Sequence, residues 1–368
     1  MKPYLRHRVE ALQAAMRQAS LDAVVFTDRE NGIYYLGATD IECAAMVVPA
    51  AGDPVACCLW LDEPYLTACS GLAGVLAYRF PASNLGRTVV AAMRRLGLCA
   101  PRVGFPKYFV ESGGFDALRT AFPGMAFLPA MELTYRVRAI KDREELALLQ
   151  KACSFLTAGM EAAVEALRPG LTEGQVLAEA DYAMRKAGSE GATFRMQVLN
   201  HDRQLLAHPY AGQELVRDNQ PVVIHLGASF RGYAAKMCRT VFLGRVPEES
   251  VRIYEALEAA QETAVAALVP GRTTAAVFDA LQAPLTAQGY GGFLPDTVGY
   301  GVGIRQSEFY PIVGRGLAHV LERDMVLGLL VPTILKPAAG GPRITDVIHV
   351  TDQGGRYMTA FNRGCIFK

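Results

Sequence analysis

A short stretch near the middle of the chain brings together side chains that could do chemistry. The segment VVIHLGASFRGYAAKMCRT, residues 222–240, carries His225, Lys236 and Cys238 in two runs of β-forming residues separated at Gly232. The alternation of these runs predicts two strands joined by a tight turn. A lysine inside a protein is costly unless it is paired or deprotonated, so a buried Lys236 would indicate a use for its charge.

Each of these residues also has an ordinary structural interpretation. Lys236 could be a solvent-facing lysine of an edge strand, and His225 could be a hydrogen-bonded core histidine. Cys238 is either a nucleophile or a buried apolar residue. His208, in LLAHPYAG, titrates near neutral pH and suits proton transfer, but could be a surface residue. Tyr300 stands between two glycines, which leaves its ring room against a ligand or in a core.

Composition limits the classes of function. Of 368 residues, 51% are hydrophobic and 20% are charged, which is typical of a globular protein. The net charge of +1 and the lack of a basic run argue against nucleic-acid binding. No run approaches the ~20 apolar residues of a membrane span, and residues 1–20 lack a signal-peptide core. The eight cysteines show no CxxC spacing, so we expect reduced thiols and a cytoplasmic protein.

The chain is expected to form two domains. Short strands and helices predict an α/β domain over residues 1–135, and the rest, 136–368, is the second domain. There a long helix, a Pro-Gly stop, a Thr-capped second helix and a group of strands occur twice, with the stops at Pro169 and Pro270. The repeat predicts two half-domains about a pseudo-twofold axis, with a pocket where their sheets meet.

Several segments of the second domain resemble the pita-bread family of methionine aminopeptidase, proline-specific aminopeptidase, prolidase and creatinase. The segments are RAIKDREELALLQKA, LRPGLTEGQV, RGYAAKMCRTVFLG, GYGVGI and PRITDVIHVTDQG, in the family's order. The resemblance implies an α+β fold. A small α/β N-terminal domain would precede a duplicated pita-bread domain of curved antiparallel sheets covered by helices.

The resemblance also implies a changed metal site. Peptidases of this family bind two metal ions through two Asp, one His and two Glu. The corresponding residues here are His225, Lys236, Tyr300, Val331 and Thr345. Divalent ions need several convergent carboxylate and imidazole donors, so this set implies no metal and no cofactor. Lys236 would then be the positive centre that binds an anionic group of the substrate.

Roles for further residues follow from the metal-free members of the family, creatinase and ectoine hydrolase. The resemblance implies that His208 is the general acid/base and that Tyr300 stabilises oxyanion charge. Glu308 matches a family acid near the substrate, and Glu42 falls near a substrate-binding arginine of creatinase. Cys238 replaces an acid that holds creatine, which argues against creatine as the substrate.

The sequence therefore predicts a metal-independent, creatinase-like hydrolase that cleaves a C–N bond in a small amide, amidine or modified amino acid bearing a carboxylate. The expected catalytic residues are His208, Tyr300 and Lys236, and the expected substrate-binding residues are His225, Lys236, Cys238, Glu308 and Glu42. Arg239 and Arg343 are interpreted as structural. The alternatives are a non-catalytic peptidase-like binding protein and, less favoured, a metal-dependent Xaa-Pro peptidase. A homodimer is expected, with no nucleic-acid or membrane partner.

Overall fold

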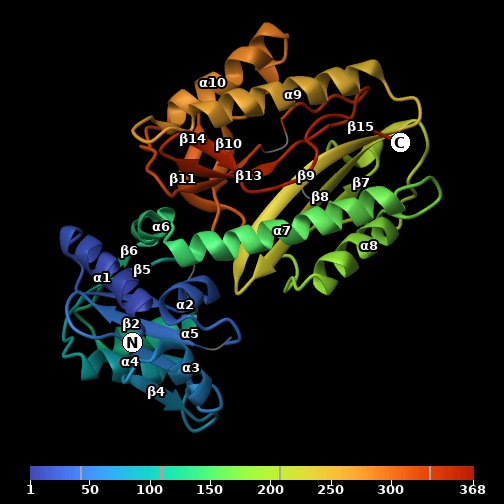
Figure 1. Cartoon of the computed structure of the whole chain (residues 1–368). Coiled ribbons are helices and arrows are strands. Elements are labelled where there is room, and N and C mark those ends of the chain that lie inside the picture. Colours follow the sequence, from blue (N-terminus) through green and yellow to red (C-terminus); the bar gives the residue numbers. More distant parts are fainter. Residues whose placement is uncertain (42–43, 108–111, 207–208, 331–332) are drawn as a thin grey trace. The chain divides into compact units, whose positions relative to one another are not determined.

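The structure is a computed structural model, and it describes residues 1–41, 44–107, 112–206, 209–330 and 333–368. Within these ranges the chain divides into two compact units, Met1–Arg138 and Ala139–Lys368. Figure 1 shows each unit as sheet covered by helices.

The N-terminal unit is built on a mixed sheet with the strand order β4-β3-β2-β1-β5-β6. The strands are β1 (Ala23–Phe26), β2 (Ala45–Pro49), β3 (Val55–Leu59), β4 (Val75–Tyr78), β5 (Arg102–Phe105) and β6 (Ala126–Pro129). The helices are α1 (Pro3–Gln18), α2 (Arg29–Leu36), α3 (Glu63–Ser70), α4 (Leu85–Arg95), α5 (Ser112–Ala121) and α6 (Met131–Ala139). Strand β1 is antiparallel to β2 and parallel to β5, so helical crossovers cover the sheet.

Local sequence explains the first helices of this unit. Helix α1 begins with Pro3, whose fixed φ suits the first helical turn, and buries Leu5, Leu12 and Met16 on one side. Helix α2 begins where the Asp28 side chain accepts the backbone N–H of Asn31 at 2.8 Å. These helices pack on the sheet through their apolar faces.

The C-terminal unit contains two sheets with the strand orders β15-β9-β8-β7 and β11-β10-β12-β13-β14. The strands are β7 (Gln197–Leu199), β8 (Gln220–Phe230), β9 (Tyr233–Leu243), β10 (Thr297–Gly301), β11 (Glu308–Gly314), β12 (Val326–Leu329), β13 (Asp346–Thr351), β14 (Gly354–Tyr357) and β15 (Ile366–Phe367). The helices are α7 (Arg143–Ala166), α8 (Glu173–Lys186), α9 (Glu248–Ala267) and α10 (Thr274–Ala287), with short 3₁₀ turns at His201–Arg203 and Gly291–Phe293.

The duplication predicted from the sequence is confirmed. Helices α7 and α8 cover the sheet of β7, β8 and β9, and α9 and α10 cover the second sheet (Figure 1). Capping boxes at Asp142 and Thr172 begin α7 and α8, each with a side chain that accepts the backbone N–H three residues on. Thr273 caps α10 in the same way. The two sheets meet where Cys238 of β9 forms a bridge with Thr345, just before β13.

The longest element of the C-terminal unit is the β8–β9 hairpin. Its two-residue turn places Arg231 and Gly232 at φ values of 47° and 79°, the left-handed geometry that matches the twist of the flanking strands. The register sets His225 opposite Cys238 and Gly227 opposite Lys236. The tight turn at Gly232 is therefore as predicted.

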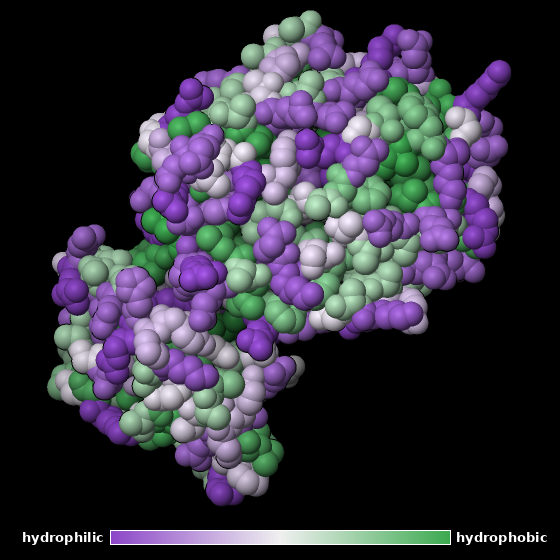
Figure 2. Space-filling model, viewed as in Figure 1, coloured by the Kyte–Doolittle hydropathy of each residue, from purple (hydrophilic) through white to green (hydrophobic). Residues whose placement is uncertain are grey.

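The face of the molecule shown in Figure 2 has no continuous apolar surface. In Figure 2 hydrophilic and hydrophobic residues alternate over both units, with a hydrophobic area beside the C-terminus. Among the helices of the described ranges, none has the length and apolar content needed to cross a membrane.

Candidate functional site

A cavity of about 860 Å³ lies within the C-terminal unit. Its walls come from both halves of the duplication, so it forms where the two sheets meet. The lining residues are Phe194, Arg195, Gln197, Leu205, His225, Lys236, Cys238, Pro295, Thr297, Tyr300, Gln306, Ser307, Leu330, Leu335, Arg343 and Thr345. The volume is in the range of small-molecule sites.

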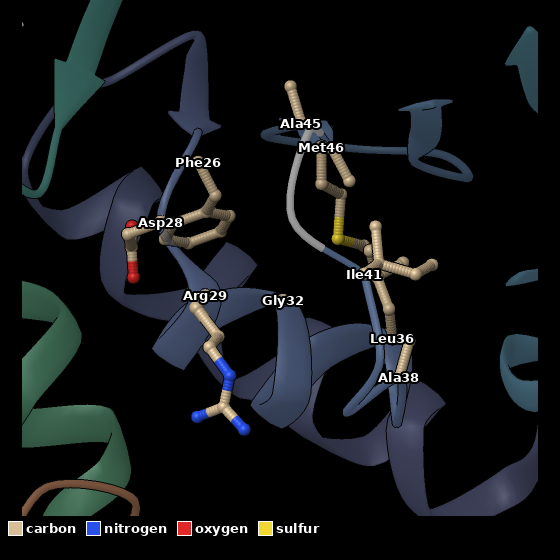
Figure 3. A pocket seen from close by; sticks show the side chains of 10 residues that line it. Phe26, Asp28, Arg29, Gly32, Leu36, Ala38, Ile41, Ala45 and Met46 are labelled. Carbon is tan, nitrogen blue, oxygen red and sulfur yellow. The ribbon is translucent and has the colours of Figure 1, made fainter. Parts of the chain in front are cut away.

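The N-terminal unit has a much smaller cavity, of about 20 Å³, beside β1, α2 and β2. In Figure 3 the side chains of Phe26 and Met46 lie on opposite sides of it. A space of this size holds about one water molecule, so it has no room for a substrate.

One wall of the large cavity is a row of side chains across three strands. Gln197 of β7 pairs with His225 of β8, and His225 pairs with Cys238 of β9. Residues directly opposite in antiparallel strands share a face, and all three line the cavity. Lys236 follows on the same face of β9, two residues from Cys238. The strand alternation thus turns both β9 residues toward the cavity.

Lys236 crosses from the first sheet to the second. Its side chain passes so close to Gly328 of β12 that a Cβ built there would lie 2.4 Å from the lysine Cε. The ammonium donates to Ser307 Oγ at 3.1 Å, and the side chain is 7% exposed. Burial lowers the pKa of Lys236 to about 8. No carboxylate of the described residues lies within ion-pair distance of it.

Arg343 is a second buried cation on the cavity wall. Its guanidinium donates to Gln197 Oε1 at 3.3 Å and to the backbone oxygens of Gln204 and Leu206. All three acceptors are neutral, and Nε has no partner among the described residues. Burial lowers the pKa of this guanidinium. The hydrogen bonds of Arg343 agree with the structural role expected for it. The residue also faces the cavity, however, so a structural role does not account for all of its contacts.

The wall also carries hydroxyl groups and a thiol. The Tyr300 hydroxyl lies 3.0 Å from the Thr297 hydroxyl, and the Thr345 hydroxyl donates to the backbone oxygen of Leu330. Burial raises the pKa of the Cys238 thiol to about 12, so this cysteine is protonated and a poor nucleophile.

The structure brings together four of the predicted site residues. His225, Lys236, Cys238 and Tyr300 line the cavity, although their roles stay predictions. Glu308 is not on the cavity wall. It is 1% exposed and lies 3.9 Å from the Lys141 ammonium, so its charge is engaged in the protein interior. This contact argues against the substrate-binding role expected for it.

Two predicted site residues, His208 and Glu42, lie outside the described ranges, as does Val331. Sequence reasoning missed Arg195 and Ser307 and took Arg343 as structural. The spacing of Arg343 and Thr345 was an available signal, since residues two apart in extended chain share a face. Ser307 lies in a turn between strands, where no periodicity marks the direction of a side chain.

The described residues do not fit the two-metal site of the peptidases. Among them, no group of three or more His, Cys, Asp or Glu could hold a metal ion. The cavity wall offers one imidazole, one phenol, one threonine hydroxyl and an ammonium at four of the five ligand positions. An ammonium repels divalent cations, and the other groups are too few to hold two of them. We therefore derive no chemical step through a metal.

The fold and the cavity define a two-domain protein of the pita-bread class. Residues 147–352 match Metallopeptidase family M24, and residues 8–140 match the Creatinase/Prolidase N-terminal domain. The chain belongs to the M24 family.

Full-length relatives carry the names of peptidases. The chain is 26% identical over 363 residues to the Xaa-Pro dipeptidase of Pyrococcus horikoshii, covering 98% of this chain and 99% of that protein. It is 26% identical over 352 residues to the Uncharacterized peptidase YqhT of Bacillus subtilis, covering 96% and 97%. The solved structure of an Xaa-Pro dipeptidase from Bacillus anthracis superposes with a TM-score of 0.89 at 23% identity, covering 99% of this chain and 100% of that one.

These relatives correct the function expected from the sequence. The prediction of a metal-independent, creatinase-like hydrolase is wrong, because a relative that matches over nearly the whole chain is an Xaa-Pro dipeptidase. Assignment to a metal-free branch of the family is likewise unsupported. The prediction rested on a few positions of the ligand set, whereas similarity over nearly the whole chain carries more information about the class of substrate.

Proposed function

We propose that this protein hydrolyses the peptide C–N bond of a short peptide bound in the large cavity of its C-terminal unit. The similarity to Xaa-Pro dipeptidases over nearly the whole chain supports the class of reaction. The cavity volume of about 860 Å³ supports a substrate of this size.

The observation that carries the proposal is the position of Lys236. A buried ammonium with Ser307 Oγ as its partner among the described residues has lost most of its hydration without gaining a counter-ion. The C-terminal carboxylate of a short peptide supplies that counter-ion and gains a charge-assisted hydrogen bond. Lys236 is then the group that holds the carboxylate end of the substrate.

Tyr300 is the proposed group near the reacting bond. Its hydroxyl pairs with Thr297, and a phenol that accepts from Thr297 can donate its own proton to a ligand oxygen. The carbonyl oxygen of a peptide gains negative charge when water attacks, and a fixed donor stabilises that charge. The imidazole of His225 or the amide of Gln197 on the neighbouring wall would orient the peptide backbone.

The test compares a dipeptide with its C-terminal amide. Hydrolysis of Ala-Pro and binding of Ala-Pro and Ala-Pro-amide are measured for the wild type, for Lys236→Met, and for Lys186→Met as a lysine control on helix α8. We expect the wild type to cleave Ala-Pro and to bind it more tightly than the amide. Lys236→Met should lose about 2–3 kcal/mol of binding, seen as a KM raised roughly 30- to 150-fold, while Lys186→Met is unchanged.

Each reaction is run in chelator and with added Mn²⁺, Co²⁺ or Zn²⁺, so that the result does not depend on metal content. Binding of peptides without cleavage in any of these buffers would overturn the hydrolase proposal. Equal affinity for acid and amide would overturn the role of Lys236.

We also propose a homodimer, as expected from the family resemblance. The stretch YYLGATDIECAAM, residues 34–46, includes Glu42 and was predicted to reach the partner's pocket. Light scattering at micromolar concentration should give the mass of two chains, and a strict monomer would contradict this.

A further inference from the structure

The large cavity has a strong imbalance of charge. Its lining includes three basic side chains, Lys236, Arg343 and Arg195, and no Asp or Glu among the residues that the structure describes. Lys236 and Arg343 are both buried, whereas Arg195 is exposed. Two buried cations on one wall repel each other and make the electrostatic potential of the space between them more positive, which favours an anionic ligand.

Elsewhere in the same unit, buried cations are neutralised by carboxylates. Arg239 forms an ion pair with Asp346 at 2.8 Å, and Lys141 lies 3.9 Å from Glu308. All four of these side chains are buried. Lys236 and Arg343 differ, because among the described residues they donate to a hydroxyl, an amide oxygen and backbone oxygens. The described part of the fold therefore pairs some buried cations with carboxylates, but not the two at the cavity.

The register places the two cations at neighbouring levels of the sheet. The Arg343 guanidinium bonds Gln197, which lies in the Gln197–His225–Cys238 row. Lys236 is two residues further along β9, and two residues of a strand advance by roughly 7 Å. This spacing lets the two cations address different groups of one ligand.

We propose that the natural substrate is a peptide-like molecule with two acid groups, one at Lys236 and Ser307 and the other at Arg343. Arg195 at the exposed side attracts such a dianion toward the cavity. The inference rests on the proposed function for the peptide-like framework, and it adds the second acid. A substrate with one carboxylate would leave one of the two buried cations without a counter-ion.

The test uses peptides that differ by one charge and almost nothing in shape. Calorimetry measures the affinity of the wild type for Glu-Pro and Gln-Pro, and for Asp-Pro and Asn-Pro, and hydrolysis is followed separately. We expect each acidic peptide to bind at least tenfold more tightly than its amide isostere, with a preference that shrinks in high salt. Equal affinities within twofold would overturn the inference, and the proposed hydrolysis would stand if either peptide is cleaved.

A variant assigns the preference to Arg343. In Arg343→Gln the preference for Glu-Pro over Gln-Pro should fall to within twofold. Arg217→Gln, an exposed arginine paired with Asp202, is the control and should keep the preference. If Arg343→Gln does not fold, the wild-type isostere pairs still decide the question. A preference without any cleavage would support the second acid and overturn the hydrolase, and no binding of any peptide would overturn both.

Discussion

The two faces of strand β9 treat a buried positive charge in opposite ways. On one face, Arg239 is fully buried and meets Asp346 through two nitrogens, with further acceptors in the backbone oxygens of Cys238 and Asn362. On the other face, Lys236 is buried at the cavity and donates to Ser307. Lys236 and Arg239 are three positions apart on one strand, yet among the described residues only Arg239 has a carboxylate as counter-ion.

The difference separates architecture from ligand binding. The Arg239–Asp346 pair joins β9 to the start of β13 and so fastens the two half-domains together, with Thr359 donating to the same carboxylate at 2.6 Å. Lys236 also spans the two sheets, but it meets no carboxylate in the part of the chain that the structure describes. Proteins tolerate a destabilising buried charge mainly at functional sites, where a ligand can neutralise it. The comparison therefore supports a ligand-binding role for the cavity face of β9.

The largest expected effect comes from breaking the paired face. Asp346→Asn keeps the shape of the side chain but leaves the Arg239 guanidinium buried without its counter-ion. We expect a loss of about 3–5 kcal/mol in the free energy of unfolding, measured by urea denaturation. Asp352→Asn, whose pair with Arg323 is exposed, should cost less than about 1 kcal/mol. A similar small loss for both variants would show that the two faces do not differ in this way.

Removing the buried charge on the cavity face should increase the free energy of unfolding rather than decrease it. Burial lowers the pKa of Lys236 from 10.5 to about 8. Below pH 8 the lysine is charged in both states, and the charge costs more free energy in the folded state, where it is buried, than in the unfolded state. We expect Lys236→Met to raise the free energy of unfolding at pH 7 by up to about 3 kcal/mol.

The gain should depend on pH in a defined direction. Between about pH 8 and 10.5 the unfolded wild type binds more protons than the folded one, so its stability rises with pH. The advantage of Lys236→Met therefore shrinks as pH rises through this window. Urea denaturation of both proteins at pH 7 and pH 9.5 measures the change. A less stable Lys236→Met at pH 7 would mean that Lys236 has a stabilising partner, and would remove the contrast between the faces.

Sequence alone was sufficient for the fold because its signals are local and repeated. The Asp142 and Thr172 capping boxes, the Pro-Gly stops and the glycine turn at Gly232 each mark an element boundary, and their recurrence marks the duplication. Alternation left the direction of Lys236 open, and the family resemblance indicated that it faces the pocket. The charge balance of the cavity was only partly predictable, because it depends on which distant residues meet.

Arg343 and Glu308 illustrate that limit. Both are single charged residues near predicted strands, and the sequence gives no measure of their surroundings. The fold places the Lys141 ammonium beside Glu308 and removes that acid from the cavity, while Arg343 receives neutral acceptors. The functional prediction failed for a related reason, because five ligand positions carry less information about the substrate class than similarity along the whole chain.

The smallest expected effect comes from moving Lys236 without removing it. In Gly328→Ala the new Cβ would lie 2.4 Å from the lysine Cε and 3.1 Å from its Nζ, so the flexible side chain must shift away from Ser307. Because the atom that must move is the end of a long side chain, we expect stability to change by less than about 1 kcal/mol. The affinity for a peptide carboxylate should fall about three- to tenfold, as for one weakened hydrogen bond to a charged group.

Gly32→Ala, where no atom lies within 4 Å of a new Cβ in helix α2, should be neutral or slightly stabilising and leave affinity unchanged. Unfolding curves and peptide titrations of the two variants give the comparison, and an unchanged affinity in Gly328→Ala would mean that the position of the Lys236 ammonium does not matter for the ligand.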